Sequence, residues 1–443
     1  MIDFKNMPLS EKENIFFKLD YVEDYESVPF KINADFIFYH CYEESPREMM
    51  VSYYPMMPLL ENTVPFEEAD YILYGHCYAR IRDMSNIVLR ELLYIDKHRK
   101  PGAEIIVVGK SANIESVLNG YIKNITFLKD HFTEKLGKKF NMDIKEEYFV
   151  YDDRFDALNI WPVDGCNKKC AFCRRTYMDI KFESIPIEQI KEELDKIRHT
   201  NPERLKHICL RAENLTEYGL DIGGKQELAS LIKLIDSYKE VETISFPIGM
   251  CISEITPEIL DALCECKKID QIYLNIETGS DRLLKLINKG HDKKKCLEVF
   301  KKLRKAHPNL YIVSNIMIGL PTEELIDIYE LVDFVCELDI DYLWINYFGV
   351  TAKLPLAKLP QLSPQLREYH LKLFLNMLYK REDNPLLRIG HPRILDKKKR
   401  STHRILESLA EEQKNYDNGL SLGVDRTLKP KSKELRKVPE LRF

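Results

Sequence analysis

Residues 158–173 read LNIWPVDGCNKKCAFC, and this stretch decides how the rest of the chain is interpreted. Its first half has the apolar pattern of a buried strand, and its second half places Cys166, Cys170 and Cys173 within eight residues. Thiolates are soft ligands that hold iron–sulfur clusters or zinc. Three thiolates on one loop can bind three irons of a 4Fe–4S cube and leave the fourth iron open to a substrate. The pattern predicts a metal centre at the carboxyl end of a strand.

The three cysteines could instead form a structural zinc site, or they could be unrelated buried thiols. Structural zinc usually takes four ligands, often as two CxxC pairs. No fourth ligand lies nearby in the sequence. The spacing therefore favours an iron–sulfur cluster over zinc, and over thiols that merely pack in a core.

From residue 149 onward, strand patterns alternate with amphipathic helix patterns, which is typical of a parallel sheet. Six such repeats span about 200 residues, fewer than the eight units and roughly 250 residues of a closed barrel. We therefore expect a partial, open (βα)6 TIM-like barrel over residues 149–360, with chemistry at the carboxyl ends of its strands. The strand patterns are LNIWPVD, LKHICLRAEN, ETISFPIGM, IDQIYLNIET, LYIVSNIMIGLP and IDYLWINYFGV.

Two further regions flank this barrel. Residues 1–148 predict a doubly wound parallel α/β domain, because strand and helix patterns alternate there as well. Cys41, Cys77 and Lys110 follow three of its strands, where ligands gather in such sheets. Residues 361–443 predict a helical extension with a basic tail. That tail is either a solvated terminus or a contact for phosphates.

The composition sets the class of protein. The chain has 443 residues, 44% hydrophobic and 31% charged, and a net charge of −5, which fits a soluble globular protein and excludes a chain-wide basic field. No apolar run approaches the roughly 18–20 residues that span a bilayer, and the first residues lack a signal-peptide pattern. We therefore expect a cytoplasmic protein without membrane contact. Its eleven cysteines, an odd number, argue against a disulfide framework.

The cysteine loop at the end of the first barrel strand resembles the signature of the radical S-adenosylmethionine (SAM) enzymes. Residues 274–284, LNIETGSDRLL, and residues 315–324, NIMIGLPTEE, are similar to that family's fourth-strand and fifth-strand segments. The resemblance implies that Cys166, Cys170 and Cys173 hold a 4Fe–4S cluster whose open iron binds SAM. It also implies reductive cleavage of SAM to a 5′-deoxyadenosyl radical, with a reductant such as flavodoxin or ferredoxin as the electron donor.

Within that superfamily, the chain resembles the methylthiotransferases over roughly residues 30–355. The segments that carry the likeness are DGCNKKC at 164–170, ENLTEYGLD at 213–221, EEAD at 67–70, GHC at 75–77, KPGA at 100–103 and IIVVGK at 105–110. In that family the N-terminal domain supplies three cysteines to a second, auxiliary cluster. Cys41 and Cys77 match the first two positions.

The sequence departs from the methylthiotransferases in three places. Lys110 stands where the family has the third cysteine, and an ammonium group is a poor iron ligand. Residues 348–352 replace the family's Arg-Pro-Gly-Thr segment, and the tail has no pattern of a TRAM-type β-barrel, the module that grips tRNA. Whether this chain holds an auxiliary cluster is therefore left open. In one interpretation Cys41 and Cys77 are ligands, and His40, His76 or a substrate thiol completes the set. In the other they are ordinary buried thiols.

Five further residues are candidates for contact with the cofactors. Glu277 ends a strand at the barrel mouth, where residues are usually functional, and is expected to contact the ribose or amino group of SAM, with Ser280 nearby. Glu213 has a similar position. Arg211 could neutralise the SAM carboxylate or form an ion pair. Phe172 lies between two cysteines and is expected to pack beside the cluster.

These patterns leave three functions open. The first is a methylthiotransferase-like enzyme that inserts sulfur or a methylthio group at a C–H bond. The second is another radical SAM modification of a peptide or small molecule, with a repurposed N-terminal domain and no complete auxiliary cluster. The third is a noncatalytic tRNA- or peptide-binding protein that keeps a structural metal. The three close thiols disfavour it, because without catalysis there is no evident benefit in keeping them open to oxidation. The acidic charge favours a peptide, protein or small-molecule substrate over tRNA.

Overall fold

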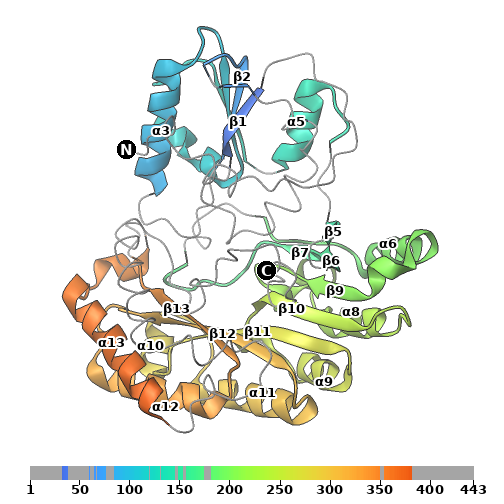
Figure 1. Cartoon of the computed structure of the whole chain (residues 1–443), viewed down its shortest axis with the longest axis vertical. Coiled ribbons are helices and arrows are strands. Elements are labelled where there is room, and N and C mark those ends of the chain that lie inside the picture. The colour runs from blue at the N-terminus through green and yellow to red at the C-terminus, as the bar shows by residue number, and fades with distance from the viewer. Residues whose placement is uncertain are drawn as a thin grey trace. The chain divides into compact units, whose positions relative to one another are not determined.

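The computed structural model describes residues 32–37, 59, 64–65, 67–75, 84–118, 120–129, 131–144, 148–152, 156–173, 181–349 and 354–381. Cys41, Cys77, His40, His76 and the basic tail lie outside these residues, as does the side chain of Lys110. The chain divides into two compact units, Met1–Glu147 and Tyr148–Phe443 (Figure 1). None of the described helices is long and apolar enough to cross a bilayer.

The first unit contains a four-stranded parallel sheet. Its strands lie side by side in chain order: β1 (Ile32–Ile37), β2 (Tyr71–Gly75), β3 (Glu104–Val108) and β4 (Ile125–Leu128). Helix α3 (Met84–His98) covers the face that carries Ile72, because Val88 and Leu92 pack there. Helix α5 (Phe132–Phe140) covers the other face, where the rings of Phe140 and Tyr71 meet at 5.0 Å. The predicted parallel α/β unit with helices on both faces is confirmed.

The second unit contains a seven-stranded sheet in the order β13-β12-β11-β10-β9-β6-β5. Strand β5 (Phe149–Asp152) is antiparallel to its neighbour and lies at the edge, and the other six strands are parallel. The predicted partial (βα)6 barrel is confirmed. In chain order the parallel strands are β6 (Ala157–Ile160), β9 (His207–Leu210), β10 (Thr243–Met250), β11 (Ile269–Glu277), β12 (Tyr311–Ile318) and β13 (Tyr342–Tyr347).

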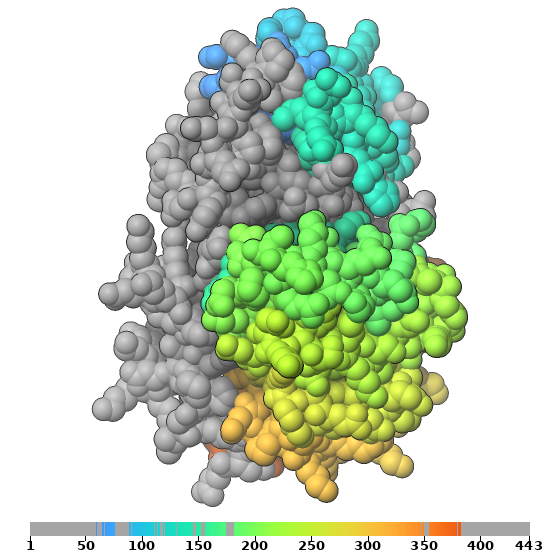
Figure 2. Space-filling view, turned by 90° about the vertical axis from the view of Figure 1, so that its right-hand side faces the viewer, coloured from blue at the N-terminus to red at the C-terminus, as the bar shows by residue number. Residues whose placement is uncertain are grey.

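Helices cover one face of this sheet (Figure 1). Alternate residues of a strand point to opposite faces, so one set of positions packs against these helices. That set is aliphatic and forms the main core, with Ile208, Ile272, Leu274, Ile312 and Ile316 among its members. The helices are α6 (Ile187–Thr200), α8 (Leu228–Asp236), α9 (Pro257–Glu265), α11 (Lys293–Ala306) and α12 (Leu325–Leu338). In Figure 2, the part of the chain coloured green to orange, which includes most of these helices, forms one continuous surface.

The opposite, inner face of the sheet carries polar side chains toward the carboxyl ends of the strands. Asn159, Asn275, Glu277 and Asn315 belong to this set, as does Arg211, which directly follows β9. Asn159, Arg211, Glu277 and Asn315 are buried. Buried polar groups are retained only where they find partners or serve a ligand. The inner face is therefore the surface on which a polar ligand can bind.

Helix α13 (Pro364–Lys380) completes the second unit. The hydroxyl of Ser363 caps it by accepting a hydrogen bond from the Leu366 amide, and Pro364 occupies its first turn, where a missing N–H costs nothing. Leu371, Phe374 and two further leucines of this helix lie in the same core as the barrel strands. The described helix of the extension predicted for residues 361–443 therefore packs as part of the barrel unit, alongside α12 (Figure 1).

This packing predicts that α13 contributes to the stability of the barrel. Phe374→Ala removes a ring with 0% exposure and should lower the free energy of unfolding of the second unit by about 3–5 kcal/mol. Tyr369→Ala, on the same helix but 52% exposed, should change it by less than about 0.5 kcal/mol. Urea titration measures both. Equal effects of the two substitutions would show that α13 is not part of the core.

Candidate functional site

The cysteine loop, residues 165–173, begins directly after β7 (Val163–Asp164). Gly165 has φ of +79°, and a Cβ there would lie 2.6 Å from the Lys181 carbonyl oxygen, so only glycine fits this turn. The Asn167 amide donates to Glu217 Oε2 at 3.1 Å, and the Ala171 amide donates to the Ile287 carbonyl at 2.8 Å. These two hydrogen bonds hold the loop against the segments that follow β9 and β11, without any contribution from a metal.

The three thiols of this loop are held in a partly buried environment. Burial raises the pKa of Cys166 to about 12 and that of Cys170 to about 11. Such thiols stay protonated near neutral pH unless a cation replaces the proton, which is how metal ligation and thiol pKa are coupled. Among the described residues, no three His, Cys, Asp or Glu side chains converge on one metal-ion position. A cluster does not require such convergence, because each thiolate binds a different iron.

A short polar chain joins the cysteine loop to the residues after β10. Lys168 Nζ lies 2.5 Å from Glu254 Oε1, which also accepts from Ser253 Oγ at 3.0 Å. The thiol of Cys251, 3.2 Å from Ser253 Oγ, interacts electrostatically with both Cys166 and Cys170. Cys251 is therefore a fourth thiol in the neighbourhood of Cys166 and Cys170, directly after β10 and far away in sequence.

A buried ion pair lies on the inner face next to the loop. Glu277 has φ of +64°, a strained conformation for a residue other than glycine, and ends β11. Its Oε1 is 2.7 Å from Lys289 Nζ, and its Oε2 accepts from Asn315 Nδ2 at 2.7 Å. Lys289 and Glu277 are 4% and 3% exposed. The pair thus holds the carboxylate of Glu277 in one orientation.

The ammonium group of Lys289 also faces the cysteine loop. Its Nζ lies 5.8 Å from the ring centroid of Phe172, and it interacts electrostatically with Cys170 and Cys251. Burial by itself lowers the pKa of Lys289. The charge of Glu277, the hydrogen bond to it and the thiols of Cys251 and Cys170 together outweigh burial and keep the pKa above its ordinary value. A permanent positive charge therefore lies beside the thiols. Sequence patterns carry no sign of this lysine, because only the fold brings residue 289 to the loop.

Ser280 has partners within the protein. It caps α10 (Asp281–Leu286), and its hydroxyl donates to the buried Asp327 at 2.6 Å. Asp327 also accepts from the guanidinium of Arg282, which binds the Thr322 carbonyl at 2.7 Å. Ser280 thus ties the start of α10 to the first turn of α12. Its expected contact with SAM remains a prediction.

Arg211 lies on the same polar face of the sheet. Its Nε donates to Asn159 Oδ1 at 2.6 Å, and its guanidinium lies 5.9 Å from the ring centroid of Trp161. Glu213, two residues on, is half-buried. Both residues follow β9, the strand next to β6 in the sheet, and β6 leads into the cysteine loop. The fold therefore places Arg211 and Glu277 on one face of the sheet, and Phe172 beside the lysine that pairs with Glu277.

The turn after β12 is held by the last helix. Gly319 has φ of +84°, and its amide donates to Glu323 Oε1 at 2.9 Å. The same oxygen lies 2.7 Å from Nδ1 of His370 on α13. The side chain of Arg367 packs so closely that its Cδ would lie 2.5 Å from a Cβ at position 319. Residues 319–323 are thus fixed by a helix outside the segments that suggested the site.

Several buried polar atoms of the inner face make no hydrogen bond within the part of the chain that the structure describes. They are Trp161 Nε1, Asn214 Nδ2, Asn275 Oδ1 and Asn315 Oδ1. They follow or belong to β6, β9, β11 and β12, so they lie on strands next to the cysteine loop and the Glu277–Lys289 pair. Unsatisfied buried donors and acceptors are costly and are expected where a polar ligand completes them. The donor set fits a cluster held by three thiolates and a polar, zwitterionic nucleoside beside it.

The barrel unit has relatives among known proteins. Residues 161–335 match the model of the radical SAM superfamily. The chain is 26% identical over 279 residues to the tRNA-2-methylthio-N(6)-dimethylallyladenosine synthase of Desulforamulus reducens, covering 62% of this chain and 58% of that protein. It is 25% identical over 303 residues to the threonylcarbamoyladenosine tRNA methylthiotransferase MtaB of Rickettsia prowazekii, covering 64% of this chain and 70% of that one.

Solved structures show more distant likenesses. The cobalamin-dependent SAM radical enzyme OxsB matches with a TM-score of 0.44 and 15% identity, over 80% of this chain and 56% of that one. The radical SAM methyltransferase TsrM of Kitasatospora setae matches with a TM-score of 0.45 and 10% identity, over 65% and 64%.

The parallel open barrel, its cysteine loop and the family match together define a radical SAM domain, which takes a 4Fe–4S cluster and SAM. More particularly, the chain is similar to tRNA methylthiotransferases, at 26% and 25% identity to the two proteins named above. It spans about 58% of the length of the Desulforamulus reducens synthase.

The ion pair gives a prediction about stability. Lys289→Met leaves the Glu277 carboxylate buried without its cation, so it should lower the free energy of unfolding by about 3–5 kcal/mol. Glu277→Gln in the same chain removes the uncompensated charge and should recover much of that loss. Lys293→Met breaks only the more exposed pair with Glu330 and should cost at most about 1 kcal/mol. Chemical denaturation of the four proteins decides whether the buried pair acts as described.

Proposed function

We propose that this protein is an enzyme that uses a 4Fe–4S cluster, bound by Cys166, Cys170 and Cys173, together with SAM to activate a C–H bond of its substrate. One observation carries the proposal: the loop of three thiols is adjacent to a polar inner face with unsatisfied buried donors and acceptors. When bound, the cluster and SAM supply one-electron reduction of the sulfonium and abstraction of a hydrogen atom. The protein supplies orientation, charge and exclusion of water.

The residues around the thiols divide these tasks. Phe172 and the buried wall of Leu283 and Leu284 pack together, so they exclude water from the loop. Lys289 places a positive charge beside thiolates that are negative once they ligate iron. Since the two charges attract in a poorly solvated site, Lys289 favours the ligated state of the loop.

The polar inner face is proposed to bind SAM. Glu277 presents a carboxylate that Lys289 and Asn315 already orient, which suits recognition of hydroxyl or ammonium groups.

Arg211, held by Asn159 and Trp161, offers a guanidinium for a carboxylate. Glu213 and Ser280 are proposed to contribute at the same face, Ser280 through its bond to Asp327.

The finer proposal is insertion of sulfur or a methylthio group. It is supported by the tRNA methylthiotransferases to which the chain is 24–27% identical, and by Cys41 and Cys77 at two of the three positions for an auxiliary cluster. The competing proposal is another radical modification, of a peptide or small molecule. It is favoured by Lys110 at the third position, because an ammonium group does not replace a thiolate. The substrate class stays a prediction, as do the reductant and the cytoplasmic location.

Iron content after anaerobic reconstitution tests both levels of the proposal. Wild type should bind about four irons per chain for each cluster that it holds. Cys166→Ala/Cys170→Ala/Cys173→Ala should lose the four irons of the radical SAM cluster and all cleavage of SAM. The double variant Cys264→Ala/Cys336→Ala removes two half-buried thiols inside α9 and α12 and should keep both.

The amount of iron that the triple variant retains distinguishes the two proposed reactions. If the triple variant retains about four irons, Cys41 and Cys77 support an auxiliary cluster, and sulfur insertion is favoured. If it retains none, the protein is a one-cluster enzyme and the methylthiotransferase likeness reflects ancestry. A wild-type chain that binds no iron and does not cleave SAM after reduction would overturn the proposal altogether.

His370 gives a further prediction, since it fixes the turn of residues 319–323 through Glu323. His370→Leu should weaken SAM binding to the reconstituted protein about tenfold, in the range seen when outer partners of binding residues are removed. His370→Asn keeps a donor near the position of Nδ1 and should bind nearly as wild type does. Equilibrium dialysis measures the affinity, and a melting curve shows whether either variant is merely unfolded. Equal affinity in all three proteins would refute the role of His370.

A further inference from the structure

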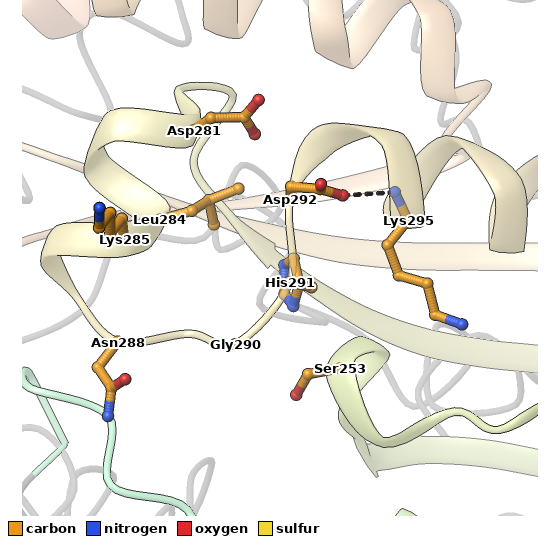
Figure 3. Close-up of a pocket in the computed structure, with 9 residues that line it drawn as sticks. All are labelled: Ser253, Asp281, Leu284, Lys285, Asn288, Gly290, His291, Asp292 and Lys295. Atoms are coloured by element: carbon orange, nitrogen blue, oxygen red, sulfur yellow. Dashed lines mark hydrogen bonds between the residues drawn. The ribbon is translucent and has the colours of Figure 1, made fainter.

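The link that joins α10 to α11, which includes Asn288 in Figure 3, is hydrogen-bonded to the cysteine loop. The Ile287 carbonyl accepts from the Ala171 amide at 2.8 Å. The next residue, Asn288, donates from Nδ2 to the Lys169 carbonyl at 2.8 Å. These two bonds hold the backbone that leads into Lys289 directly against the loop.

The backbone of Lys289 is fixed by its own neighbours as well. Its amide donates to the Leu284 carbonyl at 3.1 Å. Asn288 and Gly290, on either side of it, have φ of +53° and +85°. A Cβ on Gly290 would crowd Lys168 Nζ at 3.1 Å, so glycine suits this close approach to the loop. The side chain of Lys289 therefore starts from a defined position beside the thiols.

The ammonium group of Lys289 lies where water screens it little. The residue is 4% exposed, and its Nζ lies 2.7 Å from Glu277 Oε1 and 5.8 Å from the ring centroid of Phe172. Phe172 in turn packs against Leu283 and Leu284. A charge in such a poorly solvated place acts more strongly on its surroundings than the same charge in water.

The positive end of the Lys289–Glu277 pair faces Cys170. Among the charged groups that act on this thiol, Lys289 has the largest influence and lowers its pKa, whereas Glu277 comes second and raises it. The carboxylate of Glu277 is held on its other side by Asn315 Nδ2 at 2.7 Å. The pair is thus neutral as a whole, but its two charges do not cancel at Cys170.

We propose that Lys289 raises the reduction potential of the cluster bound by Cys166, Cys170 and Cys173. The inference rests on the proposed function, because only a protein with a reducible cluster has such a potential. One electron passes from an external one-electron donor, which is oxidised, to a cluster that three thiolates already make negative, and no atom is transferred. A nearby positive charge stabilises the more negative, reduced state more than the oxidised state.

Other charges near the loop act on the potential too. Glu217 accepts from the Asn167 amide at 3.1 Å and acts on Cys166, and Lys168 forms an ion pair with Glu254. These groups stay the same when the Lys289–Glu277 pair is changed. A comparison between variants of that pair therefore reports only the effect of its own two charges.

The test is a redox titration of the reconstituted full chain with dithionite, followed by electron paramagnetic resonance. It is done without SAM, so any contact of Glu277 with SAM has no effect. Lys289→Met/Glu277→Gln removes both charges and keeps side chains of similar size. Lys293→Met/Glu330→Gln is the matched control, because it makes the same replacements in a pair that is 31% and 39% exposed.

At the midpoint potential of wild type, Lys289→Met/Glu277→Gln should have a ratio of reduced to oxidised cluster at least about tenfold lower, or about 59 mV for a one-electron couple. The control variant should keep the wild-type ratio. Lys289→Arg keeps the charge and should stay near wild type. Glu277→Gln leaves the charge of Lys289 unopposed and should raise the ratio.

A ratio at or above that of wild type in Lys289→Met/Glu277→Gln would overturn the inference, as would an equal fall in the control variant. An equal fall in Lys289→Arg would also overturn it, because the shape of the side chain and not its charge would then set the potential. Iron content and a melting curve show which variants are loaded and folded. If Lys289→Met/Glu277→Gln does not hold its cluster, Glu277→Gln decides, since a ratio at or below wild type contradicts the inference. A wild-type protein that holds no reducible cluster would instead refute the proposed function.

Discussion

The ion pair between Glu277 and Lys289 is the interaction on which the site depends. It lies between the end of β11 and the cysteine loop, with Asn315 of β12 on its far side and Phe172 on its near side. Two charges with so little exposure are stable only as a pair, because removing either leaves the other desolvated. This one ion pair therefore has two effects. It holds Glu277 in its strained backbone conformation, and it holds a positive charge beside the thiols.

The rest of the second unit supports this contact by separating two kinds of surface on one sheet. Helix-facing positions are aliphatic and form one continuous core that includes α13, whereas the inner positions keep polar atoms that the described part of the protein does not satisfy. His370 and Arg367 extend the support to the turn after β12. The proposed cofactor site thus has side chains that the protein itself holds in place and buried polar atoms that a ligand would satisfy, which is the arrangement expected for pre-organised binding.

Much of this could be predicted from the sequence, and the reasons are local. The spacing of Cys166, Cys170 and Cys173 specifies a soft-metal loop, and alternating strand and helix patterns specify six parallel strands. Glu277 is recognisable as a candidate because it ends a strand. Lys289, Asn315, Cys251 and His370 could not be found in this way, since each acts through a neighbour that is distant in the chain. The sequence places Ser280 at the ligand, and the structure shows that its hydroxyl also binds Asp327.

The sequence by itself determined the class of chemistry, because ligand type and spacing are covalent properties of residues 166–173. It also determined the order of strands and helices, because periodicity along the chain decides which face of each element is apolar. Only the tertiary structure decided which charges meet and which are left over. Coulomb interaction and hydrogen bonding depend on separations through space, so the pairing of Lys289 with Glu277 beside the cysteine loop exists only once the barrel has folded.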